Sequence, residues 1–224
     1  MALIVHHLHV SQSERIPWLC EELGIDYELK TYKRVPILAP PEYKALHPLG
    51  TAPIIQDGEL TLAESCACIE YICHKYGQGR LFLPSTHPAY AEFLYWWHWA
   101  DGSFQPALLQ AMVMAKGGPI NDSPIAKISK DSLNRGLRAL DDRLRVNKWL
   151  IGDEFTVVDV MIVFSLTTMR YYYPYSLTEY PNTFKYLQRI GEREAYQKAM
   201  KRCDPEMELA LWSDPPTKVP VASK

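Results

Sequence analysis

The chain has 224 residues, enough for one large domain or for two smaller ones packed together. Hydrophobic residues make up 47% of it and charged residues 22%, a composition that excludes an intrinsically disordered chain. The 24 basic residues nearly balance the 26 acidic ones and form no long run that could track a phosphate backbone, so we expect no nucleic-acid partner.

Patterns in the first 32 residues predict a strand, a helix and a second strand. Residues 3–5 are a short apolar run typical of a buried strand, and residues 27–32 alternate between polar and apolar types. Apolar side chains at helical spacing cover residues 16–23 and end at Gly24, an expected left-handed cap. A proline near the start of this stripe is tolerated only in the first turn, so the helix should begin no earlier than about Ser13. This order predicts parallel strands joined by a right-handed crossover.

A hairpin and a helix follow a proline-rich stretch at residues 36–41. Residues 53–56 and 59–62 are short apolar runs, and the Asp-Gly pair between them is a strong signal for a β-hairpin. Helical spacing returns over residues 69–76, and residues 77–88, with two glycines and two prolines, predict a linker between domains. The order of the N-terminal elements is therefore β-α-β-β-β-α.

The second half of the chain predicts only helices. Its periodic apolar stretches are long enough for helices, and none resembles a strand. Thr156 and Asp159 have the spacing of a capping box before an apolar run. The expected helices are residues 89–114, 125–146, 157–171 and 184–200.

Three further features narrow the class of protein. The apolar stretches are shorter than the ~20 residues that a membrane span requires, so we expect a cytoplasmic protein with no membrane partner. The five cysteines are an odd number, and three of them crowd into one predicted helix, which argues against a disulfide framework. His6, His7 and His9 alternate between the faces of a strand, and no thiol or acid completes the set, so we predict no metal site.

Four short motifs in a fixed order carry a resemblance to a known family. They are Ser-Gln-Ser-Glu-Arg at 11–15, Trp-Leu-Cys-Glu-Glu-Leu-Gly at 18–24, His-Pro-Leu-Gly-Thr-Ala-Pro at 47–53 and Leu-Ala-Glu-Ser at 62–65. With these motifs, and with a strand-rich half before a helical half, the chain resembles the cytosolic glutathione transferases over almost its whole length. It is most similar to the bacterial and fungal group that carries a Ser-x-Ser-x-Arg segment after the first strand.

The resemblance implies an α/β plus all-α fold and a glutathione-dependent enzyme. A thioredoxin-like β-α-β-β-β-α domain would bind glutathione, and a helical bundle domain would follow it. The implied protein is a cytoplasmic, homodimeric detoxification enzyme that adds the glutathione thiolate to a small hydrophobic electrophile, with glutathione as co-substrate and no metal. The expected boundaries are 1–78 for the first domain, 79–87 for the linker, 88–210 for the helical domain and 211–224 for a C-terminal tail.

The implied glutathione site uses the last two motifs. If the Ala52–Pro53 bond is cis, as the resemblance implies, the backbone of Ala52 would pair with the cysteinyl unit like an added strand; the alternative is an ordinary proline at the start of a strand. Glu64 would accept the ammonium group. The N-terminus of the following helix and the Ser65 hydroxyl would bind the γ-glutamyl carboxylate, although Ser65 could equally serve as a plain helix cap.

The partner of the glycine carboxylate is left open. Many members of the resembling family carry lysine where this chain has Thr51, and the ammonium of that lysine would hold the carboxylate. In this chain the task would fall to His47, to Lys44 or to a backbone group.

Two serines are candidates for activating the thiol. The thiolate is the nucleophile, and each unit by which its pKa falls requires about 1.4 kcal/mol of preferential stabilisation, for example by a donated hydrogen bond. We expect Ser11 to be this donor because it lies in the loop. Ser13 is the alternative donor, although it is also well placed to be the N-cap of the helix.

The helical half offers weaker signals. Trp96, Trp97 and Trp99 present more aromatic surface than one helical domain readily covers, which predicts a subunit contact and hence a homodimer. The candidate contacts of the electrophile are Ser103, Phe104 and Tyr171.

Two alternative functions stay open at this stage. One is a dedicated isomerase, ether-cleaving or biosynthetic tailoring enzyme that uses glutathione on a single metabolite. The other is a non-catalytic interaction module, since folds are reused for assembly. The joint presence of Ser11, Ala52–Pro53 and Glu64–Ser65 argues against the second of these.

Overall fold

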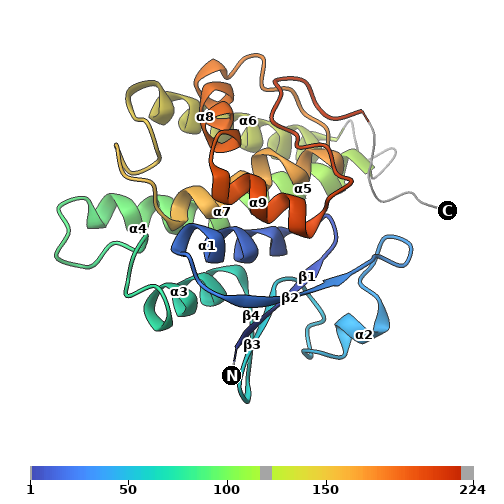
Figure 1. Cartoon of the computed structure of the whole chain (residues 1–224). Helices are drawn as coiled ribbons and strands as arrows, with labels where there is room; N and C mark the ends of the chain where they lie inside the picture. The colour runs from blue at the N-terminus through green and yellow to red at the C-terminus, as the bar shows by residue number, and fades with distance from the viewer. Residues whose placement is uncertain (1, 117–122, 218–224) are drawn as a thin grey trace. The chain divides into compact units, whose positions relative to one another are not determined.

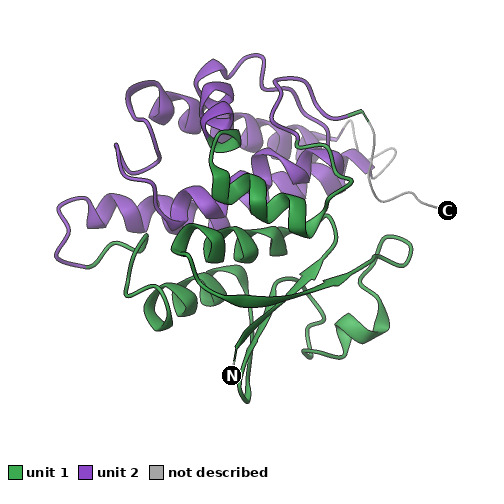
Figure 2. Ribbon diagram, in the orientation of Figure 1, with its two compact units in different colours: residues 1–84, 190–209, 217–224 green, residues 85–189, 210–216 purple. Residues whose placement is uncertain are grey.

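A computed structural model describes residues 2–116 and 123–217 of the chain (Figure 1). It contains two compact units, which Figure 2 shows in different colours: residues 1–84, 190–209 and 217–224 form one, and residues 85–189 and 210–216 form the other. Residues 190–209 thus group with the N-terminal unit, although the sequence placed them in the helical domain. Residues 218–224 of the expected tail lie outside the described residues.

The first unit is built on a four-stranded mixed sheet in the order β2-β1-β3-β4. The first two strands are parallel and the other neighbours are antiparallel, which confirms the predicted crossover and hairpin. Gly58 has a φ of 62°, a conformation that the tight turn requires and that glycine adopts without a steric cost. The strands are β1 (Leu3–Leu8), β2 (Tyr27–Tyr32), β3 (Ile54–Asp57) and β4 (Leu60–Ala63).

The helices of this unit follow the predictions except in one place. Gly24 caps α1 with a φ of 65°, as expected. The helix begins at Arg15, after a short 3-10 turn, which agrees with the expected start no earlier than about Ser13. The short helix α2 was not predicted in the proline-rich connection. The elements are the turn η1 (Gln12–Glu14), α1 (Arg15–Leu23), α2 (Pro41–Lys44), α3 (Ser65–Lys75) and α9 (Glu194–Cys203).

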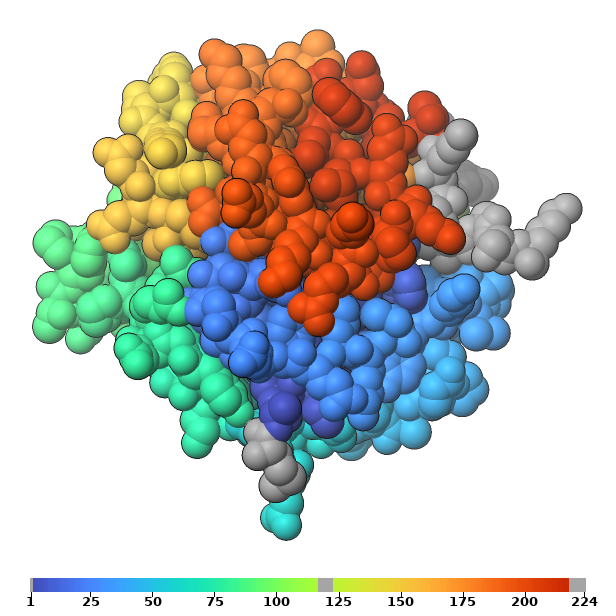
Figure 3. All heavy atoms as spheres, viewed as in Figure 1, coloured from blue at the N-terminus to red at the C-terminus, as the bar shows by residue number. Residues whose placement is uncertain are grey.

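The last helix, α9, belongs to this unit because it packs along α1. In Figure 3 the orange-red surface of α9 meets the blue surface of α1. Glu21 of α1 forms ion pairs with Lys198 and Arg202. The ring of Trp18 packs edge-on against Tyr196 at a centroid distance of 4.9 Å. These contacts join two segments that are almost 180 residues apart in the sequence.

The second unit is helical. The predicted stretch 125–146 is one continuous helix, whereas the other three predicted stretches are interrupted. The stretch 89–114 is divided by a π-helical turn (Ala100–Phe104), because Pro106 has no amide hydrogen and its ring obstructs the carbonyl one turn earlier. The stretch 157–171 ends as an α-helix at Leu166 and continues as a 3-10 turn, and 184–200 is divided between α8 and α9. The helices are α4 (Tyr90–Trp99), α5 (Gln105–Lys116), α6 (Pro124–Val146), α7 (Val157–Leu166) and α8 (Pro181–Gly191).

Two local predictions for this unit have different outcomes. The capping box of Thr156 and Asp159 is present at the start of α7. Of the three tryptophans expected to form an exposed aromatic surface on α4, Trp96 is 7% exposed, Trp97 is 2% exposed and Trp99 is half-buried. Trp96 and Trp97 therefore give no support for a subunit contact, and the homodimer stays a prediction. No helix in the described parts of the chain is both long and apolar enough to cross a membrane.

Candidate functional site

Three segments predicted to form the site are joined by two side chains of the first motif. Gln12 Nε2 donates a 2.6 Å hydrogen bond to the carbonyl of Ala52. The buried guanidinium of Arg15 donates to Ser65 Oγ at 2.9 Å and, at 3.4 Å, to the amide oxygen of Gln12. The loop after β1, the turn before β3 and the N-terminus of α3 are thus fixed to one another.

The start of α3 has the features of an anion site. Its N-cap is Glu64, which has a φ of 74° and makes no side-chain capping bond. Ser65 follows as the first helical residue, so its interpretation as a plain helix cap is wrong. Because Ser65 Oγ accepts a hydrogen bond from Arg15, its own hydroxyl proton remains available for a carboxylate. The positive end of the helix dipole also favours a negatively charged group at this position.

The turn before β3 has the expected cis peptide bond, but the carbonyl of Ala52 is only partly available to glutathione. The Ala52–Pro53 peptide bond is cis. The carbonyl of Ala52 already accepts a hydrogen bond from Gln12, so one of its two lone pairs is used within the protein. Sequence reasoning gave no role to Gln12 or Arg15, because their partners are 40 and 50 residues away along the chain.

The capping role expected of Ser13 falls to Ser11. Ser11 is the N-cap of η1, and its Oγ accepts the amide of Ser13 at 3.2 Å. Ser13 is fully buried, caps no helix, and receives the amide hydrogen of Leu8 on its Oγ. The two hydroxyl oxygens are 2.7 Å apart. The expectation that Ser13 caps α1 is wrong, because η1 occupies the residues before that helix.

The histidines on β1 meet an acid that sequence reasoning missed. Asp204, just after α9, accepts hydrogen bonds from His7 Nε2 at 2.9 Å and from His9 Nδ1 at 2.7 Å. Burial acts to raise the pKa of Asp204, but these hydrogen bonds outweigh it and hold the pKa well below its ordinary value. No group of three His, Cys, Asp or Glu side chains suited to a metal occurs among the described residues. No local sequence signal links residues almost 200 positions apart.

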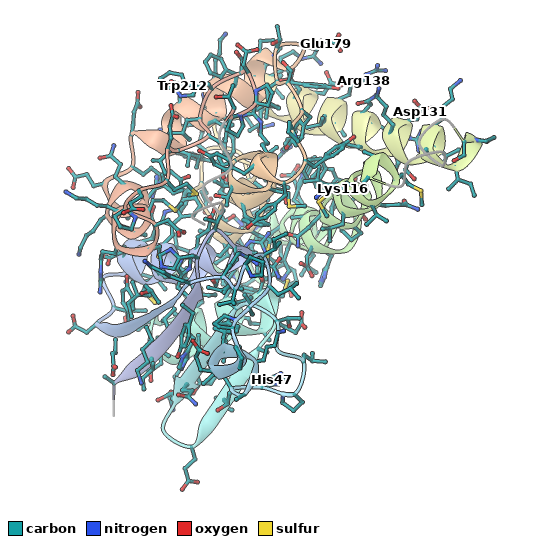
Figure 4. All side chains as sticks on the ribbon, turned by 90° about the vertical axis from the view of Figure 1, so that its right-hand side faces the viewer. His47, Lys116, Asp131, Arg138, Glu179 and Trp212 are labelled. Carbon is teal, nitrogen blue, oxygen red and sulfur yellow. The ribbon has the colours of Figure 1, made fainter. Side chains whose placement is uncertain are left out.

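The candidates for the glycine carboxylate lie around the segment between α2 and β3. Lys44 and Thr51 are exposed, and His47, which is labelled in Figure 4, is half-buried. The stem of Lys44 lies against Gly50, where an added Cβ would be 3.2 Å from Lys44 Cγ. His47 Nδ1 accepts the amide of Leu49 at 3.3 Å.

The electrophile candidates lie in the second unit and separate into two environments. Ser103 and Phe104 line a cavity of about 270 Å³ together with Trp99 and Arg135. Ser103 is exposed and Phe104 is 1% exposed. Tyr171 is buried in the 3-10 turn after α7 and is not among the residues that line this cavity.

Comparisons with known proteins point to one family. The family described as "Glutathione S-transferase, N-terminal domain" matches residues 11–75, and "Glutathione S-transferase, C-terminal domain" matches residues 104–194. The chain is 30% identical to Glutathione S-transferase 3 of Schizosaccharomyces pombe, over 97% of each protein. A solved glutathione S-transferase from Actinobacillus pleuropneumoniae is 34% identical with a TM-score of 0.82, over 93% of this chain and 98% of that one. A family member from Pseudomonas fluorescens, solved with two glutathione molecules bound, shares the fold at 21% identity and a TM-score of 0.73, over 89% of this chain and 92% of that one.

Proposed function

Because the chain belongs to the glutathione S-transferase family, we propose that it binds glutathione in its first unit and transfers the thiolate to a hydrophobic electrophile. The observation that carries the proposal is the hydrogen bond from the buried Arg15 to Ser65 at the N-terminus of α3. A buried guanidinium that donates to a hydroxyl makes that hydroxyl a better donor to an incoming anion. The γ-glutamyl carboxylate of glutathione is an anion of this kind.

The remaining polar groups of glutathione have candidate partners in the same unit. Glu64 is exposed and, when ionised, accepts from the ammonium group. The backbone of Ala52 pairs with the cysteinyl unit through the lone pair that Gln12 leaves unused. Lys44 binds the glycine carboxylate, since it is charged, exposed and adjacent to the segment that carries Thr51. His47 and Thr51 are the alternatives.

In this proposal, catalysis depends on two effects: a hydrogen bond to the thiolate and the positioning of the two reactants. Ser11 donates its hydroxyl proton to the thiolate, which makes the nucleophile available at neutral pH. The electrophile contacts Ser103 and Phe104 of the cavity in the second unit. Tyr171, buried in the 3-10 turn after α7, is the third candidate contact. Holding both reactants together supplies the rest of the acceleration. The Ser-x-Ser-x-Arg group is our proposed subfamily.

We also propose that the protein acts as a cytoplasmic homodimer in detoxification. Support for the dimer comes from exposed apolar side chains on consecutive helices: Tyr95 of α4 is 57% exposed, and Leu109 and Val113 of α5 are 39% and 59% exposed. Light scattering at micromolar concentration should give twice the mass of one chain. A mass equal to that of one chain would refute the dimer.

Titration calorimetry tests the binding step. Glutathione should bind the wild-type protein, and Ser65→Ala should weaken binding by about 1–3 kcal/mol, or about 5- to 150-fold, because the carboxylate loses a charge-assisted partner. Glu70→Ala, on the exposed face of the same helix, is the matched control and should bind as the wild type does. Absence of heat at millimolar glutathione would overturn the proposed function.

Product analysis separates conjugation from other glutathione chemistry. Mass spectrometry after incubation with an aryl halide or an enone should find the thioether, whose mass includes the whole tripeptide. A product that has the mass of its substrate would instead show an isomerase. Tight glutathione binding with no turnover of either electrophile class would favour a non-catalytic module.

A further inference from the structure

Four buried polar side chains form a continuous chain of hydrogen bonds behind the proposed thiol site. The hydroxyl oxygens of Ser11 and Ser13 are 2.7 Å apart, Ser13 Oγ is 2.9 Å from His7 Nδ1, and His7 Nε2 is 2.9 Å from Asp204 Oδ2. None of the four side chains belongs to a residue that is more than 5% exposed. We call Ser11, Ser13, His7 and Asp204 the relay.

Asp204, at one end of the relay, determines which ring nitrogen of His7 carries a hydrogen. Asp204 also accepts the amide hydrogen of Val10 on both oxygens, at 3.1 and 3.2 Å, and a hydrogen bond from His9. A carboxylate surrounded by donors is ionised and only accepts, so Nε2 of His7 carries a hydrogen. In neutral His7 the other ring nitrogen, Nδ1, is then an acceptor.

The direction of the remaining hydrogen bonds follows from this. Because Nδ1 of neutral His7 is an acceptor, the 2.9 Å hydrogen bond between this atom and Ser13 Oγ requires Ser13 to be its donor. The other atoms to which the Ser13 hydroxyl could donate are Ser11 Oγ at 2.7 Å and the carbonyl of Leu8 at 3.4 Å. Ser13 Oγ then has no proton to offer its neighbour, so Ser11 must be the donor across the 2.7 Å contact. A lone pair of Ser11 Oγ is left to accept a proton from outside.

We propose that the thiol proton of bound glutathione passes along the relay from Ser11 to Nδ1 of His7, an inference that rests on the function proposed above. The S–H bond breaks as Ser11 Oγ takes the proton, the hydroxyl proton of Ser11 moves to Ser13, and that of Ser13 moves to His7. The result is a thiolate facing the Ser11 hydroxyl and an imidazolium paired with Asp204. No electrons are transferred to or from a cofactor, and the proton returns along the same oxygens to product or water.

Only Ser11 touches the substrate in this scheme, and the other three residues act through it. A base of this kind explains why a carboxylate is buried beside a buried histidine of β1. The backbone before Ser11 is also tightly held: Val10, a β-branched residue, has a φ of 51°, and Arg34 donates to the carbonyls of His9 and Val10. A strained backbone held in place next to Ser11 fits a site in which the hydroxyl group of Ser11 must be positioned accurately.

Other titratable groups surround the relay and are assigned no part in it. His9 faces His7 at a ring-centroid distance of 5.8 Å and shares Asp204. Glu14 is buried in η1. Cys203, beside Asp204 on α9, is a buried thiol whose pKa burial raises well above its ordinary value, so it stays protonated. A solution readout must therefore be specific to the ring of His7.

Nuclear magnetic resonance of ring-labelled histidine tests the proposal in the wild-type protein. Addition of glutathione at pH 7 should convert the signals of His7 from neutral imidazole to imidazolium. S-methylglutathione, which has the same tripeptide and no thiol proton, should leave His7 neutral. With a pH indicator in weak buffer, the ultraviolet absorbance of the thiolate should appear without release of a matching amount of acid.

Variants then separate the relay from simple packing. His7→Asn should lower kcat/KM at neutral pH by roughly 10²-fold, a typical contribution of general base catalysis, and should move the rising limb of the pH–rate profile upward. His6→Asn is the matched control, because His6 is the buried neighbour on β1 and bonds to Tyr32 and Gln56, outside the relay. It should leave the profile in place. Ser13→Ala should shift the profile as His7→Asn does, and this variant supplies the test if His7→Asn fails to fold.

The outcomes distinguish this inference from the proposed function. If glutathione binds as a thiolate while one proton per site enters the solvent and His7 stays neutral, the relay is overturned and the transferase proposal survives. If His7 is already an imidazolium in the free protein, the relay is overturned too. If glutathione does not bind at all, both proposals fall.

Discussion

Replacing Asp204 by alanine should lower the free energy of unfolding by about 2–6 kcal/mol. Its carboxylate accepts hydrogen bonds from three residues, of which His7 is 0% and Val10 is 3% exposed. Each of these two donors would lose its buried carboxylate acceptor, at a cost of about 1–3 kcal/mol apiece. His9 is partly exposed, so its ring can turn to water and contributes little.

The expected loss of stability for Asp204→Ala lies toward the lower end of this range, because a second effect of the substitution is stabilising. Removing a buried charge recovers the cost of having taken it out of water. Asp204→Asn separates the two effects, since it keeps the shape and one acceptor oxygen but loses the charge. We expect its destabilisation to be smaller than that of the alanine variant.

The pH dependence gives this prediction its sharpest form. The pKa of Asp204 is lowered in the folded protein, so its stabilisation is fully present above the pKa of an unfolded aspartate, near 3.9, and is lost as the pH falls below that value. The difference in stability between the wild type and Asp204→Asn should therefore be constant from pH 7 to about pH 5. It should shrink as the solution becomes more acidic.

Urea unfolding followed by circular dichroism measures the free energy of unfolding of the wild type, Asp204→Ala and Asp204→Asn at several pH values. Asp26→Ala is the control, because Asp26 is exposed and its removal should change stability by less than about 0.5 kcal/mol. A loss below about 1 kcal/mol for Asp204→Ala at pH 7 would refute the reasoning, and so would a difference that does not respond to acid.

Three further changes probe the site and the second unit. Arg15→Lys should weaken glutathione binding about fivefold in titration calorimetry, because one ammonium cannot reproduce the fork that reaches both Ser65 and Gln12; unchanged affinity would remove Arg15 from the site. Thr156→Ala should cost about 0.5–2 kcal/mol in thermal unfolding as a lost helix cap, and no loss would show that the capping box is dispensable. Gly136→Ala should destabilise the protein in urea, although alanine favours a helix by about 1 kcal/mol, because the new Cβ would meet a ring carbon of the buried Phe104 at 2.8 Å; a gain in stability would show that the ring moves aside.

Features of the fold that depend on residues close together in the sequence were predictable. Gly24 ends α1 and Gly58 forms the hairpin turn because both positions need a positive φ. The capping box at Thr156 is likewise a local pattern. Periodicity alone could not place every helix end. The apolar stripe over residues 89–114 continues through the π-helical turn, and the interruption is marked in the sequence by Pro106 and not by the stripe.

The site was predictable as a set of motifs but not as a set of contacts. The segments of Ser11, Ala52 and Ser65 were each identified, and the structure fixes them to one another. The side chains that do so, such as Arg15, bond to residues far away in the sequence, and so does Asp204. Spacing along the chain carries no information about such pairs, because the tertiary fold alone brings them together.

The ultraviolet difference spectrum of bound glutathione at pH 7 tests the central claim most directly. A free thiol with a pKa near 8.5 is mostly protonated at this pH, so a thiolate band requires stabilisation by the protein. If the Ser11 hydroxyl stabilises the thiolate, the band should appear with the wild-type protein, saturate with glutathione concentration and be strongly reduced in Ser11→Ala. Saturable binding of glutathione to the wild-type protein at pH 7 without any thiolate band would contradict it.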